Sequence, residues 1–304
     1  MKKISIIGSG NVGRRIGKEF LRHENEVVFY DISYDVVEEL KKNRYDASLD
    51  VRYAINKTDI SFVAVPTPLG EDDTYDISFL KDAAAICGAS LKKKDDYHIF
   101  VLKSTVTPGT TEKDFIPALE KYSGKQEGDG FGVVYNPEFL TVIQNTWTDK
   151  KDFCISPGNE GRIVLGEGKN KKAGNIIEKL FKEENSETPI LRTDYNTAEL
   201  TKLVANNRLP LVISFSNEIY EVAEELKKNN VEVDADFIMN AVAMDSRIGP
   251  YGSVFGKAWG GPCFTKDTKA LKKWIEKETG QTPKIISSSI EVNNMMKKKY
   301  GVRE

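Results

Sequence analysis

A cysteine near the end of the chain stands in a setting that suits a nucleophile. Cys263 follows a Gly-Gly-Pro turn that begins at Gly260, and it precedes Lys266 and Asp267 by three and four residues. A thiolate is a far better nucleophile than a thiol, and positive charge or a helix N-terminus favours the thiolate. If a helix begins just after Cys263, the lysine and the aspartate lie on its first turn. The same pattern also fits a buried structural cysteine beside a helix cap.

A second chemical pair lies in a long helical pattern from Ala198 to about Asn229. Lys202 and Asn206 are four residues apart, so their side chains project from one face of that helix. An exposed lysine with a polar neighbour is the ordinary interpretation of such a pattern.

A glycine-rich turn indicates a dinucleotide site near the N-terminus. A short apolar strand over 4–7 runs into Gly8-Ser9-Gly10-Asn11-Val12-Gly13, and a helical pattern follows to about Arg22. A second apolar strand over 26–31 ends in Asp31. The glycines allow a tight turn and close approach of the backbone to a pyrophosphate, which the helix N-terminus stabilises. Asp31 can accept hydrogen bonds from ribose hydroxyls and disfavours a 2′-phosphate, so we expect NAD rather than NADP.

The alternation of strands and helices continues after this turn. We expect strands over 60–65, 97–103, 131–135, 162–165 and 189–192, and helices over 33–43 and 77–91 and from the 104–111 loop to about residue 122. This order predicts an α/β fold with a doubly wound sheet of the Rossmann type, whose ligands gather beyond the carboxyl ends of the strands. Thr67, Thr105 and Glu138 lie at such ends. Each could instead be a turn residue or a helix cap.

The rest of the chain reads as helical. Asn196 or Thr197 can cap the long central helix, and Pro210 should kink it. Further helices are expected over 234–243 and 283–299. A Rossmann-type sheet is therefore followed by a long central helix and a smaller helical region.

Composition excludes several classes of protein. The 304 residues carry a formal net charge of −2, which gives no general attraction to nucleic acid or membranes. The N-terminus lacks a signal peptide pattern, no apolar run is long enough to span a bilayer, and the three cysteines favour no disulfide framework. We therefore expect a cytoplasmic protein. His23 and His98 stand in no metal-ligand spacing, so we expect no metal and place both at the surface or a strand edge. The runs Lys92–Lys94 and Lys297–Lys299 are expected on solvated faces.

Several motifs occur in an order that resembles the UDP-glucose and GDP-mannose (nucleotide-sugar) 6-dehydrogenase family. They are the N-terminal GxGxVG, Val65-Pro66-Thr67-Pro68, Ser104-Thr105-Val106, Pro108-Gly109-Thr110-Thr111, Asn136-Pro137-Glu138-Phe139-Leu140, Ala198-Glu199-Leu200 with Lys202 and Asn206, Ser214-Phe215 with Asn217-Glu218, Arg247-Ile248-Gly249, and Gly260-Gly261-Pro262-Cys263-Phe264 with Lys266-Asp267. The resemblance covers nearly the whole chain, and the Cys263 stretch is its most specific part.

The resemblance implies NAD-dependent oxidation of the C6 alcohol of a UDP-glucose-like sugar nucleotide to the uronic acid. Two hydride transfers would proceed through a thiohemiacetal and a thioester on Cys263. It implies a catalytic set of Cys263, Lys202, Asn206, Asp267, Thr105 and Glu138. It assigns to the cofactor Gly8, Gly10, Asn11, Val12, Gly13, Asp31, Thr67, Pro68, Thr105 and Lys266, and to the substrate Glu138, Phe139, Leu140, Lys202, Asn206, Arg247, Tyr251 and Gly260. It also implies a homodimer built on the central helix, with Arg247 reaching substrate across the interface.

Family members continue with a second Rossmann-like unit that holds most of the uridine diphosphate. We expect this chain to lack that unit, with an NAD-binding domain over 1–195 and a helical dimerisation and catalytic-cysteine region over 196–304. Thr141-Val142-Ile143 and Lys257-Ala258-Trp259 also depart from the family's usual residues. Two alternatives stay open: a catalytically silent NAD-binding homologue, and a two-electron β-hydroxyacid-type dehydrogenase that uses Lys202 and leaves Cys263 idle.

Overall fold

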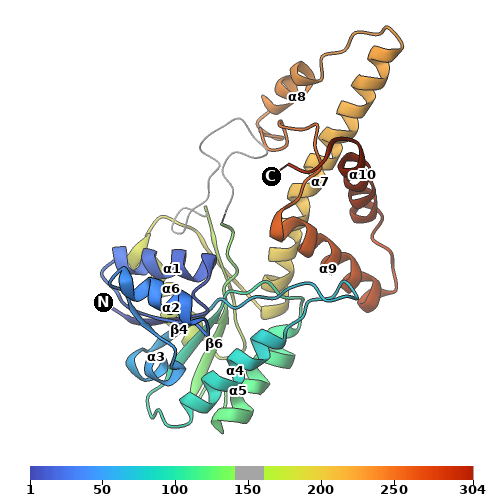
Figure 1. Ribbon diagram of the computed structural model, residues 1–304. Coiled ribbons are helices and arrows are strands. Elements are labelled where there is room, and N and C mark those ends of the chain that lie inside the picture. The colour runs from blue at the N-terminus through green and yellow to red at the C-terminus, as the bar shows by residue number, and fades with distance from the viewer. Residues whose placement is uncertain (141–160, 304) are drawn as a thin grey trace. The chain divides into compact units, whose positions relative to one another are not determined.

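The computed structural model describes residues 1–140 and 161–303, and these fall into two compact units (Figure 1). The sheet unit contains residues 1–68, 75–140 and 161–202, and the helical unit contains residues 69–74 and 203–303. The helix α7 (Tyr195–Lys228) begins in the first unit and continues into the second. Thr141, Val142, Ile143 and Cys154 lie outside the described residues.

One eight-stranded sheet organises the sheet unit. Its strand order is β3-β2-β1-β4-β5-β6-β7-β8, and all neighbours are parallel except β6 and β7. The strands are β1 (Lys3–Ile7), β2 (Glu26–Tyr30), β3 (Asp46–Ser48), β4 (Ile60–Val63), β5 (His98–Leu102), β6 (Phe131–Tyr135), β7 (Ile163–Gly166) and β8 (Ile190–Thr193). The strand order reverses between β1 and β4, where ligands bind in folds of this kind. The predicted α/β fold with a doubly wound sheet is confirmed.

Helices cover both faces of this sheet, which explains why the central strands β4, β5 and β6 are buried along their whole length. The sheet-unit helices are α1 (Asn11–Arg22), α2 (Tyr34–Lys42), α3 (Val51–Lys57), α4 (Ser78–Leu91), the π-helix η1 (Thr111–Phe115), α5 (Ile116–Ser123) and α6 (Lys172–Glu184). Side chains of α1, α2 and α6 share one core cluster on one face, and α4 and α5 lie on the other (Figure 1). In that cluster the rings of Phe20 and Phe62 lie 4.7 Å apart. The sequence did not predict β3, α3 or α6.

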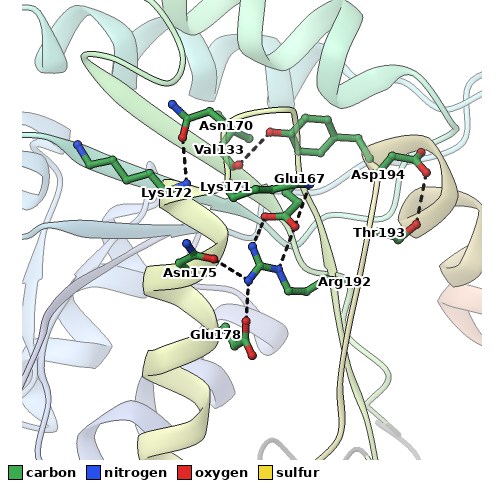
Figure 2. A network of polar contacts seen from close by, with 11 residues as sticks. Val133, Glu167, Asn170, Lys171, Lys172, Asn175, Glu178, Arg192, Thr193 and Asp194 are labelled. Carbon is green, nitrogen blue, oxygen red and sulfur yellow. Dashed lines mark hydrogen bonds and ion pairs between the residues drawn. The ribbon is translucent and has the colours of Figure 1, made fainter.

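A polar network fixes the edge formed by β7 and β8 (Figure 2). The Arg192 guanidinium donates to both carboxylate oxygens of Glu167 (2.9 and 2.7 Å), and also to Glu178 and Asn175 on α6, at 2.7 Å each. A Cβ at Gly174 would overlap the Glu167 carboxylate. The network therefore ties α6 to the edge strand β8 and to the residue that follows β7, through charge-assisted bonds.

Lys94 and His98 are buried, which corrects the expectation that Lys94 lies on a solvated face and His98 at the surface or a strand edge. The Lys94 ammonium donates to the carbonyl oxygen of Ile55 at 2.9 Å and to that of Thr58, and its Nζ lies 3.2 Å from His98 Nδ1. His98 Nε2 is 2.7 Å from Ser61 Oγ. Helix α3 ends at this point, and its last carbonyl groups need donors that the helix itself cannot supply. Lys94 supplies them, while the remaining residues of both lysine runs, and His23, are exposed as expected.

The central helix begins earlier than predicted. Helix α7 starts at Tyr195, and Asp194 caps it by accepting the backbone N–H of Thr197 at 2.9 Å. The prediction of Asn196 or Thr197 as cap is therefore wrong, because Asp194 supplies the carboxylate that accepts this N–H. The helix continues through Pro210, although proline has no N–H to donate to the carbonyl four residues before it.

The described part of the helical unit holds three further helices, two of which contribute to a small core. They are α8 (Ala235–Ala243), α9 (Gly261–Thr279) and α10 (Lys284–Tyr300). Ile213 and Trp259 are buried together, and the Trp259 indole N–H donates to Ser214 Oγ at 2.9 Å. The Asn293 side chain bonds both the N–H and the C=O of Trp259, at 2.7 and 3.0 Å. These bonds fix the backbone just before Gly260, the N-cap of α9.

Candidate functional site

The glycine turn after β1 has the backbone that a dinucleotide site needs. Gly8 has φ +91°, and a Cβ there would lie 2.8 Å from the Ala64 carbonyl oxygen. A Cβ at Gly13 would overlap the Gly8 carbonyl, whereas one at Gly10 would meet nothing within 4 Å. The turn is therefore tight on its inner side and open at Gly10, which is the N-cap of α1. Asn11 and Val12 form the first residues of this helix.

Asp31, the residue directly after β2, holds this turn in place. Its Oδ2 accepts the backbone N–H of Ser9 at 2.8 Å, and its Oδ1 accepts that of Ser33 at 2.9 Å. The buried Ser9 hydroxyl donates to the Tyr30 carbonyl at 3.0 Å. The structure thus brings Asp31 to the glycine turn, as the spacing predicted, through a serine that the sequence did not single out.

The loops after β4 and β5 meet, as expected for neighbouring strand ends. Thr67 Oγ1 donates to the Thr105 carbonyl at 2.7 Å, and Ser104 Oγ donates to the Val65 carbonyl at 2.6 Å. Thr67 is buried and Thr105 is half-buried. Pro68 follows Thr67 directly, so it is fixed at the same loop.

Lys202 and Glu138 form a direct ion pair within the sheet unit. Lys202 is 2% exposed, and its Nζ lies 3.2 Å from Glu138 Oε1 and also donates to the Glu138 carbonyl. Glu138 Oε2 accepts the Leu140 backbone N–H at 2.7 Å. The Phe139 ring centroid lies 5.3 Å from Lys202 Nζ and 4.1 Å from Arg162 Cζ, so the ring contacts two cations. The interpretation of Lys202 as an exposed lysine is therefore wrong.

In the helical unit, Asp267 is the centre of a second polar cluster. Its carboxylate is 1% exposed and accepts the Asn206 amide N–H at 2.6 Å and the Lys266 ammonium at 2.6 Å. Asn207 donates to the Asp267 carbonyl at 3.3 Å. Asn207 was not predicted as a site residue, and its only sequence signal is its place next to Asn206. These contacts orient one charged carboxylate and leave it little freedom to turn.

Cys263 is exposed on the first turn of α9, which begins at Gly261 rather than after the cysteine. Gly261 has φ +81° and follows the N-cap Gly260. Asp267 lies one helical turn after Cys263, at the i+4 position that shares its face. The alternative of a buried structural cysteine applies instead to Cys87, which is buried in α4, where burial raises the pKa of its thiol to about 12.

Arg247 and Tyr251, which were predicted to bind substrate, are not part of the polar clusters described above. The Arg247 side chain is 86% exposed and pairs with the neighbouring Asp245. Tyr251 packs against the Ile213–Trp259 core of the helical unit, and burial raises the pKa of its phenol. Among the described residues, no group of three or more histidine, cysteine or acidic side chains is placed to hold a metal ion. Within the same residues, no helix combines the length and apolar character that crossing a bilayer requires.

Sequence comparisons identify the family. The profile for the NAD binding domain of the UDP-glucose/GDP-mannose dehydrogenase family matches residues 36–185, and that for its central domain matches residues 196–295. The UDP-glucose 6-dehydrogenase of Haloferax volcanii is 34% identical over 96% of this chain and 69% of its own length. The chain belongs to the UDP-glucose/GDP-mannose dehydrogenase family. Membership implies NAD as the cofactor, and the open glycine turn with Asp31 fits it.

Other relatives and solved structures similar to this chain are also dehydrogenases. The GDP-mannose 6-dehydrogenase of Pseudomonas aeruginosa is 30% identical over 88% of this chain and 63% of its own length. The solved UDP-glucose dehydrogenase of Pyrobaculum islandicum is 29% identical, with a TM-score of 0.81 over 98% of this chain and 69% of that one. A Mycobacterium tuberculosis 3-hydroxyisobutyrate dehydrogenase shares the fold at 12% identity, with a TM-score of 0.67 over 99% of this chain and 95% of that one. The chain spans 63% to 69% of the length of its nucleotide-sugar relatives.

Proposed function

We propose that this chain oxidises the C6 alcohol of a nucleotide sugar to the uronic acid, with Cys263 as the nucleophile. The observation that carries the proposal is the exposed Cys263 one helical turn before a buried Asp267 that Asn206 and Lys266 hold in place. A two-electron dehydrogenase that relies on Lys202 gives no reason for this cluster. The named activities of the Haloferax and Pseudomonas relatives support the substrate class.

The sheet unit supplies the cofactor residues in this proposal. Gly8, Gly10 and Gly13 allow the backbone to approach the pyrophosphate at the start of α1, with Asn11 and Val12 in its first turn. Asp31 binds the adenosine ribose, and the Thr67-Pro68 and Thr105 loops line the nicotinamide side. NAD, when bound, accepts one hydride in each of two oxidation steps.

The first oxidation develops negative charge on the C6 oxygen, and cationic and amide donors stabilise such charge. We assign this role to Lys202 and Asn206. The proton of the alcohol passes to water, which Asp267, Thr105 and Glu138 hold and orient. Lys266 neutralises Asp267 and supports the thiolate beside it on α9.

The thiolate of Cys263 then adds to the aldehyde carbon, forming a C–S bond while the carbonyl π electrons move to oxygen. Loss of the second hydride from C6 converts this thiohemiacetal into a thioester. Water attacks the thioester, a C–O bond forms, the C–S bond breaks and the thiolate leaves. In sum, one alcohol, two NAD⁺ and one water give one carboxylate, two NADH and three protons.

The substrate residues of the proposal lie in both units. Phe139 and Leu140 follow β6 beside the Lys202–Glu138 pair and line the sugar path. Gly260 begins the cysteine turn, while Tyr251 supports that turn from the core. Arg247 carries its charge on an exposed side chain, which suits an anionic diphosphate on a neighbouring subunit.

We further propose a homodimer built on the central helix. Val204, Phe215 and Val222 are 51%, 57% and 51% exposed on α7. Their separations of 11 and 7 residues place them on one helix face, where an apolar stripe that the described residues leave exposed suits a second copy. Light scattering of the wild type and of a Phe215→Glu variant tests this. The proposal expects a dimer that the variant weakens, and a wild-type monomer at all concentrations would contradict it.

The activity is tested with a panel of UDP- and GDP-sugars, measured by thermal stabilisation, NADH formation and acid product. Binding to the native state raises the melting temperature, so a ligand is detected even without turnover. The proposal expects one sugar nucleotide to stabilise the protein and to yield two NADH per acid. One NADH per product would instead indicate the two-electron reaction. Stabilisation by NAD without turnover on any sugar nucleotide would indicate a silent homologue.

A further inference from the structure

Two motifs that the proposed chemistry does not use meet at one buried carboxylate. Glu199, in the second turn of α7, is fully buried. Its Oε2 accepts the Gly109 backbone N–H at 2.7 Å. Its Oε1 accepts the Thr111 backbone N–H at 2.9 Å and the Thr111 hydroxyl at 2.6 Å. Three donors from one short segment thus converge on one side chain almost 90 residues away in sequence.

The donors belong to the loop that carries Thr105. The start of this loop is fixed by Ser104, which donates to the Val65 carbonyl, and by Thr67, which donates to the Thr105 carbonyl. Its end is fixed by Glu199, whose carboxylate accepts the backbone N–H of the first residue of η1, as the side chain of an N-cap residue would. Gly109, at φ +98°, adopts the left-handed conformation in this segment and donates its N–H to the carboxylate.

The same part of α7 also reaches the next strand end. Lys202 follows Glu199 by three residues and bonds Glu138 in the segment after β6. One turn of helix therefore contacts both the Thr105 loop and the Glu138 segment, through side chains that are each almost fully buried. Rigid contacts of this kind hold reacting groups to within fractions of an ångström.

We propose that Glu199 is a positioning residue, whose carboxylate fixes the loop bearing Thr105 against the turn of α7 bearing Lys202. The catalytic use of that loop rests on the proposed function, but the anchoring does not. Three donors require an acceptor on both oxygens, and the anion supplies it. In the protonated acid, one acceptor site becomes a donor, which only the Thr111 hydroxyl can receive.

The charge of Glu199 changes near neutral pH. Burial raises its pKa to about 7, and the bonds from Thr111 and Gly109 oppose that rise. Of the neighbouring charges, Glu112 on η1 raises the pKa further, Lys113 lies beside Gly109, and the Lys202 ammonium is directed at Glu138. The loop is therefore held by all three bonds above pH 7 and by fewer below it.

Hydrogen exchange of the 104–111 segment tests the anchoring without any substrate. In the wild type, protection of the Gly109 and Thr111 amides, corrected for intrinsic exchange, should fall by about tenfold from pH 8.5 to pH 6. Glu199→Gln should show low protection at both pH values, because its amide group places a donor against a donor. Glu112→Gln is the comparison variant: it leaves the three bonds to Glu199 in place and removes a charge that raises the pKa of Glu199, so it should keep high protection at pH 8.5 and lose protection only at lower pH than the wild type. Equal protection in Glu199→Gln and wild type at pH 8.5 would overturn the proposal.

A kinetic measurement separates positioning from simple stability. If turnover is observed, Glu199→Gln should lower kcat by about tenfold and remove the acidic limb of the pH profile near pH 7. Thr111→Val should lose part of the activity and Thr111→Ser should regain it. An unchanged pH profile in Glu199→Gln would contradict a positioning role. If Glu199→Gln fails to fold, hydrogen exchange of the variants Thr111→Val and Thr111→Ser tests the anchoring instead. Equal protection in these two variants would overturn the anchoring.

Discussion

The Lys202 ammonium lies 3.2 Å from Glu138 Oε1, and it also donates to the Glu138 carbonyl. Both side chains are mostly buried, with exposed fractions of 3% and 13%. The pair joins α7 to the segment after β6 and keeps a positive charge beside Phe139. It therefore links the packing of the sheet unit to the residues assigned to substrate.

Breaking this pair should cost stability as well as activity. Lys202→Met leaves the Glu138 carboxylate without its cation, so we expect the free energy of unfolding to fall by about 3 kcal/mol. Glu138→Gln should cost less, and the double variant less than the sum of the two single changes. Urea unfolding of all four proteins measures this coupling. Strict additivity would show that the pair contributes nothing.

Asp267 should matter for the rate more than for folding. Asp267→Asn keeps an acceptor for Asn206 but removes the charge that faces Lys266. We expect kcat to fall by about 100-fold. Asp73→Asn is the matched control, because Asp73 forms an exposed ion pair with Lys269 on α9, at 3.0 Å. Comparable kinetics for the two variants would remove Asp267 from the catalytic set.

Glu184 should make stability fall as pH rises. Burial raises the pKa of its carboxyl to about 8, while the Asn25 amide donates to it at 2.9 Å. The folded state therefore holds a proton that the unfolded state releases above about pH 4.5. Its stability contribution is complete below pH 4.5 and is lost as pH rises through 8, by about 2 kcal/mol after allowance for partial exposure. Glu184→Gln should flatten this part of the pH–stability curve, as thermal unfolding from pH 5 to 9 can measure.

His98 should make stability fall as the pH drops, which is opposite to the effect of Glu184. Burial and the Lys94 ammonium hold the pKa of this imidazole well below its usual range. The unfolded state therefore binds a proton first, and stability falls as pH drops below about 6.5. His98→Leu should reduce this acid sensitivity but cost about 2 kcal/mol at pH 8, because Ser61 and Lys94 lose a partner. His23→Leu, at the surface, is the matched control and should change the stability at pH 8 by no more than about 0.5 kcal/mol.

The sequence predicted the parts of the fold that have strong local patterns. The strands around Ile6, Phe62 and Val133 are apolar runs, and burial on both faces explains them. Strand β3 was not predicted, because only Ala47 is buried in it and the strand therefore has no apolar run. The cap at Asp194 was missed because Asn196 and Thr197 are equally good caps by type, and only the backbone decides between them.

The sequence predicted which residues form the candidate site, but only some of the contacts between them. Strand ends brought Thr67 and Thr105 together as expected, because parallel strands end at one edge of a sheet. The bond between Asn206 and Asp267 spans 61 residues and follows from tertiary packing alone. Lys94 was misplaced for the same reason, since its partners are carbonyl groups at the end of a helix that the sequence did not predict.

The most direct test of the account is the ratio of NADH to acid in a Cys263→Ala variant, with Cys87→Ala as the matched control. The wild type and the control should form two NADH per acid, and acid-quenched turnover should leave a sugar adduct on the Cys263 peptide. Cys263→Ala should form no acid and no adduct. If Cys263→Ala still yields acid with two NADH per product, the thiol is not the nucleophile and the proposed mechanism is wrong.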